Sequence, residues 1–340
     1  MSEENPPGLD LERLARQLDR ERPGLVRGPL RAEVIQGGRS NLTYRVTDGE
    51  SRWVVRRPPL GHVLATAHDM AREYRVISAL HDTDVPVPET VLLCEDVDVL
   101  GAPFYVMEQV AGTPYRTADE LVPLGPDRTR ALALALPDTL VALHSVDPDS
   151  VGLADFGRPE GFLERQLRRW GKQLEASRSR ELAGIDELRE TLGKQLPVSP
   201  PPTVVHGDFR LDNVLADADD RIAAVLDWEM STLGDPLTDL GLLAMYSERL
   251  NIPDPPISTT AEAPGHPTPQ ELIERYAAGS GRDVSRVNWY IAFAWFKLGV
   301  ILEGIHYRYT LGQTVGPGFD RIGGLVPVFI DNGLTTLRKG

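Results

Sequence analysis

One short stretch, residues 204–227, carries four polar side chains whose types suit phosphoryl transfer: His206, Asp208, Asn213 and Asp227. That chemistry needs a carboxylate near the attacking hydroxyl and oxygen ligands for Mg²⁺. Asp208 and Asn213 have the spacing H-x-D-x-x-x-x-N, in which the Asp orients or accepts the hydroxyl proton and the Asn binds a metal. Asp227 ends an apolar run predicted to be a buried strand, so its carboxylate is expected to emerge beside Asn213. The stretch predicts Asp208 as the acid–base residue and Asn213 and Asp227 as metal ligands.

The same stretch resembles the hallmark of the aminoglycoside phosphotransferase family. Residues 206–213 are HGDFRLDN, the next strand ends in Asp227-Trp228, and residues 234–241, GDPLTDLG, are similar to the family's continuation after that strand. The resemblance implies an α+β, bilobal, protein-kinase-like fold, with an antiparallel sheet and a helix in the N-lobe and a mainly helical C-lobe. It also implies a nucleotide and Mg²⁺ as cofactors.

Four polar residues near the motif have simpler explanations. His206 is as consistent with a satisfied core histidine as with a direct role, and Asp212 suits a surface turn. Asp235 belongs to a Gly-Asp-Pro turn, and Asp239 lies early in a predicted helix, where a carboxylate favours the helix dipole. We therefore expect Asp235 and Asp239 to be mainly structural.

A candidate phosphate-binding turn lies near the N-terminus. Residues 34–46 have the pattern of two strands joined by a tight turn, and the main chain at Gly37, Gly38, Ser40 and Asn41 can approach phosphates closely. The turn lacks both the G-x-G-x-x-G pattern and a Walker A motif, so an ordinary hairpin is the alternative.

The next predicted strand, residues 53–59, carries arginines where a kinase carries its phosphate-binding lysine. The first lysine of the chain is Lys172, so an arginine must replace it. Arginine can bind phosphate with two parallel hydrogen bonds. We assign the role to Arg56 rather than Arg57, because Arg56 follows two apolar residues. The pattern resembles the subfamily of kinase-like domains fused to certain acyl-CoA dehydrogenases, in which an arginine also stands here.

Glu73 is the expected partner of Arg56. Residues 67–80 form a predicted amphipathic helix with Met70, Tyr74 and Ile77 on one face, and Glu73 borders that face. A solvent-exposed Glu73 is the alternative.

The predicted strand at residues 104–110 ends before Ala-Gly-Thr-Pro at residues 111–114, where a hinge between lobes is expected. Backbone groups from Glu108 to Val110 are candidates for binding the adenine edge. We therefore expect a nucleotide-binding N-lobe over residues 1–109 and a C-lobe over residues 110–340 that contains the catalytic loop, the metal site and the acceptor-binding helices.

Beyond this hinge the apolar spacing is helical. Helices are predicted at residues 126–145, 161–177, 181–195, 271–278 and 287–309. The aromatic side chains of the last segment are expected in the core. Its polar exceptions are candidate acceptor contacts: Lys297, Glu303, His306 and Arg308.

Composition narrows the class of protein. The 340-residue chain is 41% apolar, has one cysteine and carries a net charge of −14. The charge disfavours nucleic acid and anionic membranes and leaves a cationic acceptor electrostatically favoured. We expect a cytoplasmic protein without a membrane span, and the oligomeric state stays open.

The sequence therefore predicts an ATP- or GTP- and Mg²⁺-dependent phosphotransferase that acts on a hydroxyl of a small molecule. The acceptor is an aminoglycoside-like compound or a hydroxy metabolite such as a hydroxyacyl-CoA. One alternative is a non-catalytic nucleotide-binding protein with a kinase-like fold, which the missing lysine favours. The other is a hydrolase with paired carboxylates, which leaves Asn213 unexplained.

Overall fold

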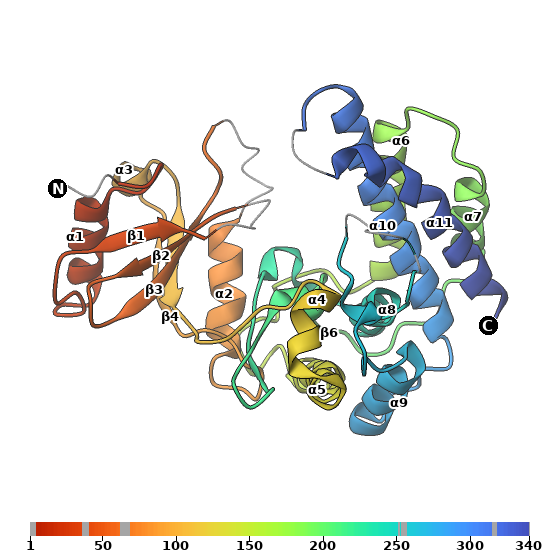
Figure 1. Cartoon of the computed structure of the whole chain (residues 1–340), viewed down its shortest axis with the longest axis horizontal. Coiled ribbons are helices and arrows are strands. Elements are labelled where there is room, and N and C mark those ends of the chain that lie inside the picture. The colour runs from red at the N-terminus through yellow and green to blue at the C-terminus, as the bar shows by residue number, and fades with distance from the viewer. Residues whose placement is uncertain are drawn as a thin grey trace. The chain divides into compact units, whose positions relative to one another are not determined.

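A computed structural model describes residues 5–35, 41–61, 69–250, 252, 257–314 and 318–339 (Figure 1). The chain divides into two compact units. The first unit comprises Met1–Gly112 and Ala223–Ser231, and the second comprises Thr113–Ile222 and Thr232–Gly340. The segment that carries Asp227 therefore belongs to the first unit, although it follows the motif of Asp208 in sequence.

The first unit is built on a five-stranded antiparallel sheet with the strand order β1-β2-β3-β5-β4. The strands are β1 (Arg31–Val34), β2 (Leu42–Thr47), β3 (Arg52–Arg57), β4 (Thr90–Cys94) and β5 (Phe104–Glu108). In this register Arg56 lies between Thr43 of β2 and Tyr105 of β5. The predicted phosphate-binding residues Gly37, Gly38 and Ser40 lie outside the described residues.

Helices flank this sheet: α1 (Leu11–Glu21), α2 (Met70–Leu80) and the short α3 (Val97–Leu100) (Figure 1). Alternate strand residues, among them Tyr44, Val55 and Phe104, share one apolar core with α1 and α3. Successive strand side chains point to opposite faces, so Arg56 faces away from this core. The predicted helix at residues 67–80 is present as α2, which begins after the N-cap Asp69.

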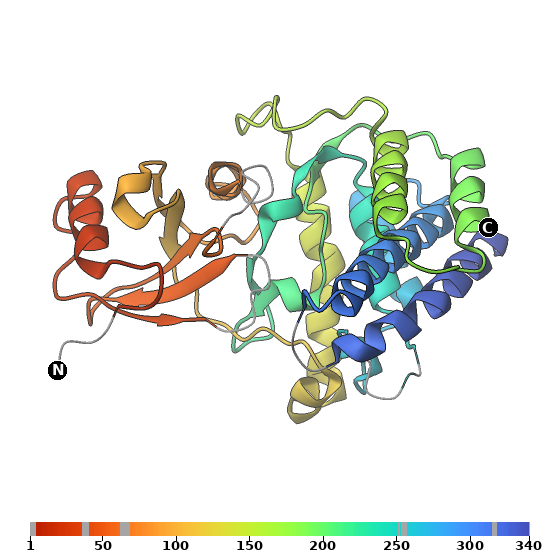
Figure 2. The same cartoon turned by 90° about the horizontal axis from the view of Figure 1, so that it is seen from above.

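The second unit is mainly helical (Figure 2). Its helices are α4 (Ala118–Leu121), α5 (Pro126–Ser145), α6 (Phe162–Ser177), α7 (Ile185–Lys194), α8 (Leu237–Tyr246), α9 (Pro269–Ser280), α10 (Val287–Thr310) and α11 (Phe319–Arg338). Strand β6 (Thr203–Val205) pairs with β9 (Thr232–Gly234). The remaining strands are β7 (Val214–Ala216) and β8 (Ile222–Val225), and β8 runs across the boundary between the units. The α+β class predicted from the sequence is confirmed.

Helix α10 is the centre of the second unit and packs against α6, α8 and α11. The aromatic side chains of its first half are buried, as predicted, and the rings of Trp289 and Phe293 stack at 5.4 Å. Near its end Tyr309 is exposed. Helix α11 was not predicted, because Pro327 and three glycines interrupt its apolar pattern. Within the described ranges, no helix is long and apolar enough to cross a membrane.

Candidate active site

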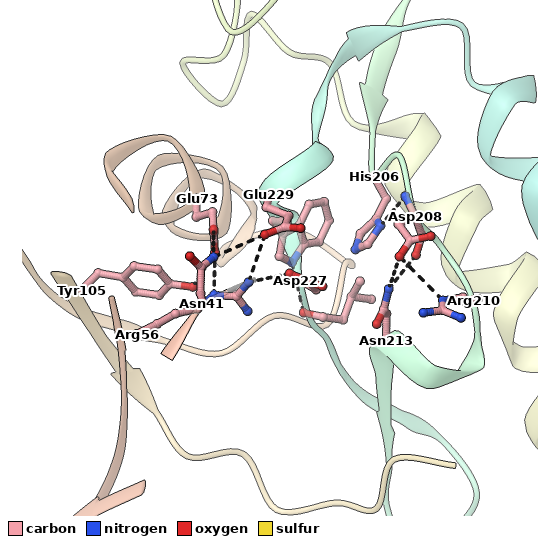
Figure 3. A network of polar contacts seen from close by, with 12 residues as sticks. Asn41, Arg56, Glu73, Tyr105, His206, Asp208, Arg210, Asn213, Asp227 and Glu229 are labelled. Carbon is pink, nitrogen blue, oxygen red and sulfur yellow. Dashed lines mark hydrogen bonds and ion pairs between the residues drawn. The ribbon is translucent and has the colours of Figure 1, made fainter. Parts of the chain in front are cut away.

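Arg56 is the centre of a buried ion-pair network in the first unit (Figure 3). Its side chain is 12% exposed, and its Nε lies 3.1 Å from Oε2 of Glu73. Its Nη2 donates to Oδ1 of Asp227 at 2.5 Å and lies 3.8 Å from Oε2 of Glu229. The predicted ion pair between Arg56 and Glu73 is confirmed. One guanidinium therefore faces three carboxylates.

Burial and the neighbouring charges act in opposite directions on this network. Burial raises the pKa of Glu73 to about 7, against the lowering effect of Arg56. Burial alone would lower the pKa of Arg56, but Tyr105, Glu73 and Asp227 raise it, so the guanidinium stays charged. The hydroxyl of Tyr105 donates to Oε2 of Glu73 at 3.0 Å. The carboxylate of Glu73 is thus held between a cation and a hydroxyl donor.

Asn41 links this network to a residue that the sequence analysis missed. Its buried Nδ2 donates to Oε1 of Glu73 at 3.2 Å and to Oε2 of Glu229 at 3.3 Å. Glu229 follows Asp227-Trp228 directly, and this adjacency was the available signal. Asn41 is the predicted phosphate-turn residue that the structure describes.

The backbone at Asp227 explains how its carboxylate reaches Arg56. Asp227 follows β8 and has φ 65° and ψ 62°, in the left-handed region that few residues other than glycine adopt. The short 3₁₀ turn Trp228–Met230 comes next, and Nε1 of the buried Trp228 donates to Val225 O at 3.0 Å. This tight turn redirects the chain at the strand end. Such backbone conformations cluster at functional sites.

Arg57 has a different role from Arg56. Its Nη1 donates to Gly8 O at 2.6 Å and to Leu100 O at 2.7 Å, and the residue is buried. These contacts tie the segments next to α1 and α3 together. The structure therefore favours Arg56 as the arginine of the network.

The loop after β6 carries the motif of the second unit. Nδ2 of Asn213 donates to Oδ2 of Asp208 at 3.0 Å and to Asp208 O at 2.8 Å, so the two predicted site residues lie together (Figure 3). Nε of Arg210 lies 3.6 Å from Oδ2 of Asp208, and its Nη1 lies 3.2 Å from Oδ2 of Asp212. Because both donors of the Asn213 amide point toward Asp208, its Oδ1 is the amide atom left for a cation.

Asp239 holds the backbone of this loop. It is buried in α8, where Oδ2 accepts from His206 N–H at 2.6 Å and Oδ1 accepts from Gly207 N–H at 2.8 Å. Burial would raise the pKa of Asp239, but the hydrogen bond from His144 and the loop N–H groups outweigh it and lower the pKa. The residue was expected near a helix start, and it is there. Its hydrogen bonds to the loop backbone are consistent with the structural role expected of it.

The buried His144 completes this anchor. Its Nε2 lies 3.3 Å from Oδ2 of Asp239, and its Nδ1 lies 2.8 Å from the hydroxyl of Tyr276. Burial lowers the pKa of His144. A chain of polar contacts therefore connects α9 and α5 to α8 and the loop.

The other polar neighbours of the motif have structural partners. Nδ1 of the fully buried His206 accepts from Asp208 N–H at 3.2 Å, which agrees with the structural interpretation. Asp212 accepts from the hydroxyl of Ser258 at 2.7 Å. Asp235 accepts from the hydroxyl of Tyr290 at 2.7 Å, as expected of a structural carboxylate.

The four polar exceptions on α10 differ in what they contact. Nζ of Lys297 donates to Gly207 O at 2.7 Å, so Lys297 reaches the catalytic loop. Glu303 is fully buried and pairs with Arg180, whose Nη2 donates to its Oε2 at 2.7 Å. Nδ1 of His306 is buried without a hydrogen-bond partner among the described residues, and Arg308 is exposed. Lys297 is therefore the exception that lies at the motif.

The predicted adenine-binding segment lies at the end of β5. The N–H of Glu108 donates to Glu89 O at 2.8 Å, and the N–H of Gln109 donates to Arg52 O at 3.2 Å. The backbone N–H groups of Glu108 and Gln109 are therefore already hydrogen-bonded within the protein. Val110 is the next residue of the segment. A contact of Glu108 or Val110 with a base stays a prediction.

The fold and these two constellations define a class of protein, and comparison with known proteins identifies it. The model of the phosphotransferase enzyme family matches residues 31–282. The chain belongs to this family.

Relatives refine the assignment. Acyl-CoA dehydrogenase family member 11 of Gallus gallus is 34% identical over 97% of this chain and 44% of its own length. The chain thus spans less than half of that relative. This agrees with the predicted resemblance to kinase-like domains fused to acyl-CoA dehydrogenases.

Solved structures share the fold. A protein from Ralstonia eutropha, provisionally described as an aminoglycoside phosphotransferase, is 32% identical, with a TM-score of 0.85 over 97% of this chain and 98% of that one. A mutant of aminoglycoside phosphotransferase APH(4)-Ia in complex with AMP-PNP and hygromycin B has a TM-score of 0.62 at 15% identity, over 96% of this chain and 98% of that one. The second likeness shows the fold alone.

Proposed function

We propose that this chain transfers the γ-phosphoryl group of ATP to a hydroxyl of a small molecule in a Mg²⁺-dependent reaction. Membership of the phosphotransferase family supports small-molecule phosphotransfer in general. The observation that carries the proposal is the 3.0 Å hydrogen bond between Asn213 and Asp208, which pairs a candidate base with a candidate metal ligand. GTP is the alternative donor.

Asp208 is the residue proposed to act on the acceptor. A carboxylate at this position of the motif orients the hydroxyl and takes its proton as the phosphoryl group is transferred. Asp239 and His206 position it, since both bond to the backbone of the loop. Arg210, 3.6 Å away, supplies a positive charge next to the carboxylate.

The residues present fit a magnesium ion. Asn213 Oδ1 and the Asp227 carboxylate are hard oxygen ligands, which Mg²⁺ prefers. Mg²⁺ commonly binds one or two protein carboxylates, substrate phosphates and water, so it needs no dense protein cage. Among the described residues no group of three or more His, Cys, Asp or Glu side chains could hold a metal ion. A bound Mg²⁺ would neutralise charge on the transferred phosphates.

Arg56, oriented by Glu73, is proposed to bind the α- and β-phosphates. In the structure Arg56 donates to Asp227. A bound nucleotide would offer phosphate oxygens to the guanidinium, and the Asp227 carboxylate would then be available to hold Mg²⁺. Gly37, Gly38, Ser40 and Asn41 are proposed to cover the phosphates. Backbone groups at Glu108 and Val110 are proposed to contact the base.

Calorimetric titration of ATP and GTP, with and without Mg²⁺, tests the nucleotide site. Metal-dependent binding to the wild type that is lost in Asp227→Ala would support the proposal. Failure of both nucleotides to bind would exclude it. Binding without turnover of any hydroxyl compound, in a broad screen with γ-labelled nucleotide, would favour the non-catalytic alternative that the missing lysine suggests.

A further inference from the structure

A second group of cations lies next to the catalytic loop in the second unit. The chain has 36 basic residues, of which only four are lysines, and one of these, Lys297, contacts the loop. Its Nζ donates to the carbonyl oxygen of Gly207, the residue that precedes Asp208. An ammonium group has three N–H donors, so two remain after this bond.

Trp170 of α6 connects Lys297 to a second cation. Nζ of Lys297 lies 5.6 Å from the centre of the Trp170 ring, and Cζ of Arg169 lies 5.3 Å from it. Both distances are within the range of cation–π attraction. Trp170 is 3% exposed, and its Nε1 is buried without a hydrogen-bond acceptor in the parts of the chain that the structure describes. A buried donor without an acceptor is unfavourable, because it has given up its hydrogen bond to water.

These two cations lack the acidic partners that arginines elsewhere have. Arg210 is within ion-pair distance of Asp208 and Asp212. Across the described ranges, by contrast, no carboxylate forms an ion pair within 4 Å with Lys297 or Arg169. Burial lowers the pKa of Lys297, and the carboxylates of Asp208 and Asp239 raise it from beyond that distance. The chain has 50 acidic residues against 36 basic ones, so unpaired cations beside a reactive loop run against the overall composition.

We propose that Lys297 and Arg169, placed about the Trp170 ring, form a subsite for a negatively charged group, a carboxylate or a phosphate, of the acceptor. This inference deepens the proposed phosphotransferase function and rests on it. The half-buried ammonium of Lys297 gains most from an anion, because a partly desolvated charge needs a partner. The acceptor is then an anionic hydroxy compound.

The charges of Lys297 and Arg169 favour an anionic acceptor, whereas the net charge of the whole chain favours a cationic one. The net charge of −14 favours a cationic acceptor at long range. Beside the Trp170 ring, however, a cationic group would meet the positive charges of Lys297 and Arg169 at short distance. The short-range contacts determine which charge on the acceptor is favoured, because salt screens the effect of exposed charges more than about 10 Å away.

The anionic group bound by Lys297 and Arg169 could instead be the γ-phosphoryl group of the nucleotide. The two cases differ in which ligand a Lys297 variant binds more weakly. An acceptor subsite would lose affinity for anionic hydroxy compounds, with ATP and ADP affinities unchanged. A phosphoryl subsite would lose affinity for ATP relative to ADP.

Three small probes that differ in charge test the subsite: glycerate, glycerol and 3-amino-1,2-propanediol. Their binding to the full chain with ADP and Mg²⁺ is measured by ligand-observed NMR. We expect glycerate to bind about tenfold or more tightly than the other two, which is the size of one charge-assisted hydrogen bond. Lys297→Met should abolish this preference, Arg169→Met should reduce it, and Lys297→Arg should retain most of it.

Lys172→Met is the matched control. Lys172 is exposed on the same helix, and its replacement removes the same charge, so the preference for glycerate should be unchanged. Arg169 is exposed as well, so its variant tests the subsite even if Lys297→Met does not fold. Equal binding of the three probes, or a preference that survives in both Lys297→Met and Arg169→Met, would overturn the proposal. So would a loss confined to ATP.

Nucleotide binding is a separate measurement, so the two proposals can fail independently. If neither nucleotide binds, the phosphotransferase function fails. The probe titration still shows whether a Lys297-dependent anion site exists, because it does not require turnover.

Discussion

The two units differ in how many carboxylates surround their cations. In the first unit one cation, Arg56, faces Glu73, Asp227 and Glu229, so negative charge is in excess. In the second unit the half-buried Lys297 and the exposed Arg169 flank Trp170, and no carboxylate in the part of the chain described lies within ion-pair distance of either. A folded chain tolerates such imbalance poorly unless a ligand compensates for it. The difference motivates the two proposals made above, Asp227 of the first unit as a Mg²⁺ ligand and an anion subsite in the second.

The largest expected effect is on catalysis in the second unit. Asp208→Asn should lower kcat by about 10²–10⁴-fold, because it removes the base but preserves the shape of the side chain. The dissociation constant of the nucleotide should not change, because Asp208 is proposed to act on the acceptor and not to bind the nucleotide or the metal. Steady-state kinetics and calorimetry measure the two quantities. A variant with nearly full activity would remove Asp208 from the mechanism.

The next largest effect is on the nucleotide site of the first unit. Arg56→Lys keeps the charge but loses the forked donor geometry, so nucleotide affinity should fall about tenfold. Arg57→Lys is the matched control, because Arg57 bonds only to backbone carbonyls of Gly8, Leu100 and its neighbour Pro58 among the hydrogen bonds that the described residues show. It should lower stability and leave affinity unchanged. The opposite pattern would exchange the roles of the two arginines.

Removal of the loop anchor should destabilise the second unit. Asp239→Ala leaves the N–H groups of His206 and Gly207 buried without their acceptor, which should cost about 3 kcal/mol of unfolding free energy. Urea denaturation measures it. Glu190→Ala, which breaks an exposed pair with Lys194, should cost about 0.5 kcal/mol or less. Equal losses in the two variants would contradict the anchoring role.

The smallest effect is on the pH dependence of stability. The pKa of His144 is lowered by burial, so the folded state binds fewer protons than the unfolded state below the usual value of 6.5. The lowered pKa of Asp239 acts in the same direction at lower pH, below its usual 3.8. Stability contributed by this pair is therefore lost as the pH falls.

His144→Gln isolates the histidine part of that dependence. The slope of unfolding free energy against pH just below 6.5 should become flatter than in the wild type. His81→Gln, at an exposed position, should leave the slope unchanged. If the slope of the His144 variant equals that of the wild type, His144 does not titrate in this range.

Local motifs predicted the fold class and several contacts of the site. The pairing of Glu73 with Arg56 was expected from the kinase pattern, in which a strand cation pairs with a helix carboxylate. The apolar spacing of α2 and the two apolar residues before Arg56 then indicated the positions. The H-x-D-x-x-x-x-N spacing likewise brought Asp208 to Asn213. A contact within one short loop can be predicted in this way, because the spacing of the two residues along the chain limits how far apart they can lie.

Contacts between distant segments were harder to predict. Asp239 anchors a loop 32 residues earlier in the chain, and Lys297 reaches Gly207 from 90 residues away. Neither contact follows from spacing, since each depends on how helices pack around a shared core. Asn41 and Glu229 illustrate the same limit, because their bond joins segments 188 residues apart.

The bonds from Asp239 to the catalytic loop have a consequence for hydrogen exchange. The amide protons of His206 and Gly207 are held by a carboxylate on α8, a helix that is buried almost throughout. They can exchange with solvent only when α8 itself is released, so their exchange should be as slow as that of the core. On heating, the loop should therefore keep its conformation until the whole second unit unfolds, and activity and tertiary structure should be lost at one temperature.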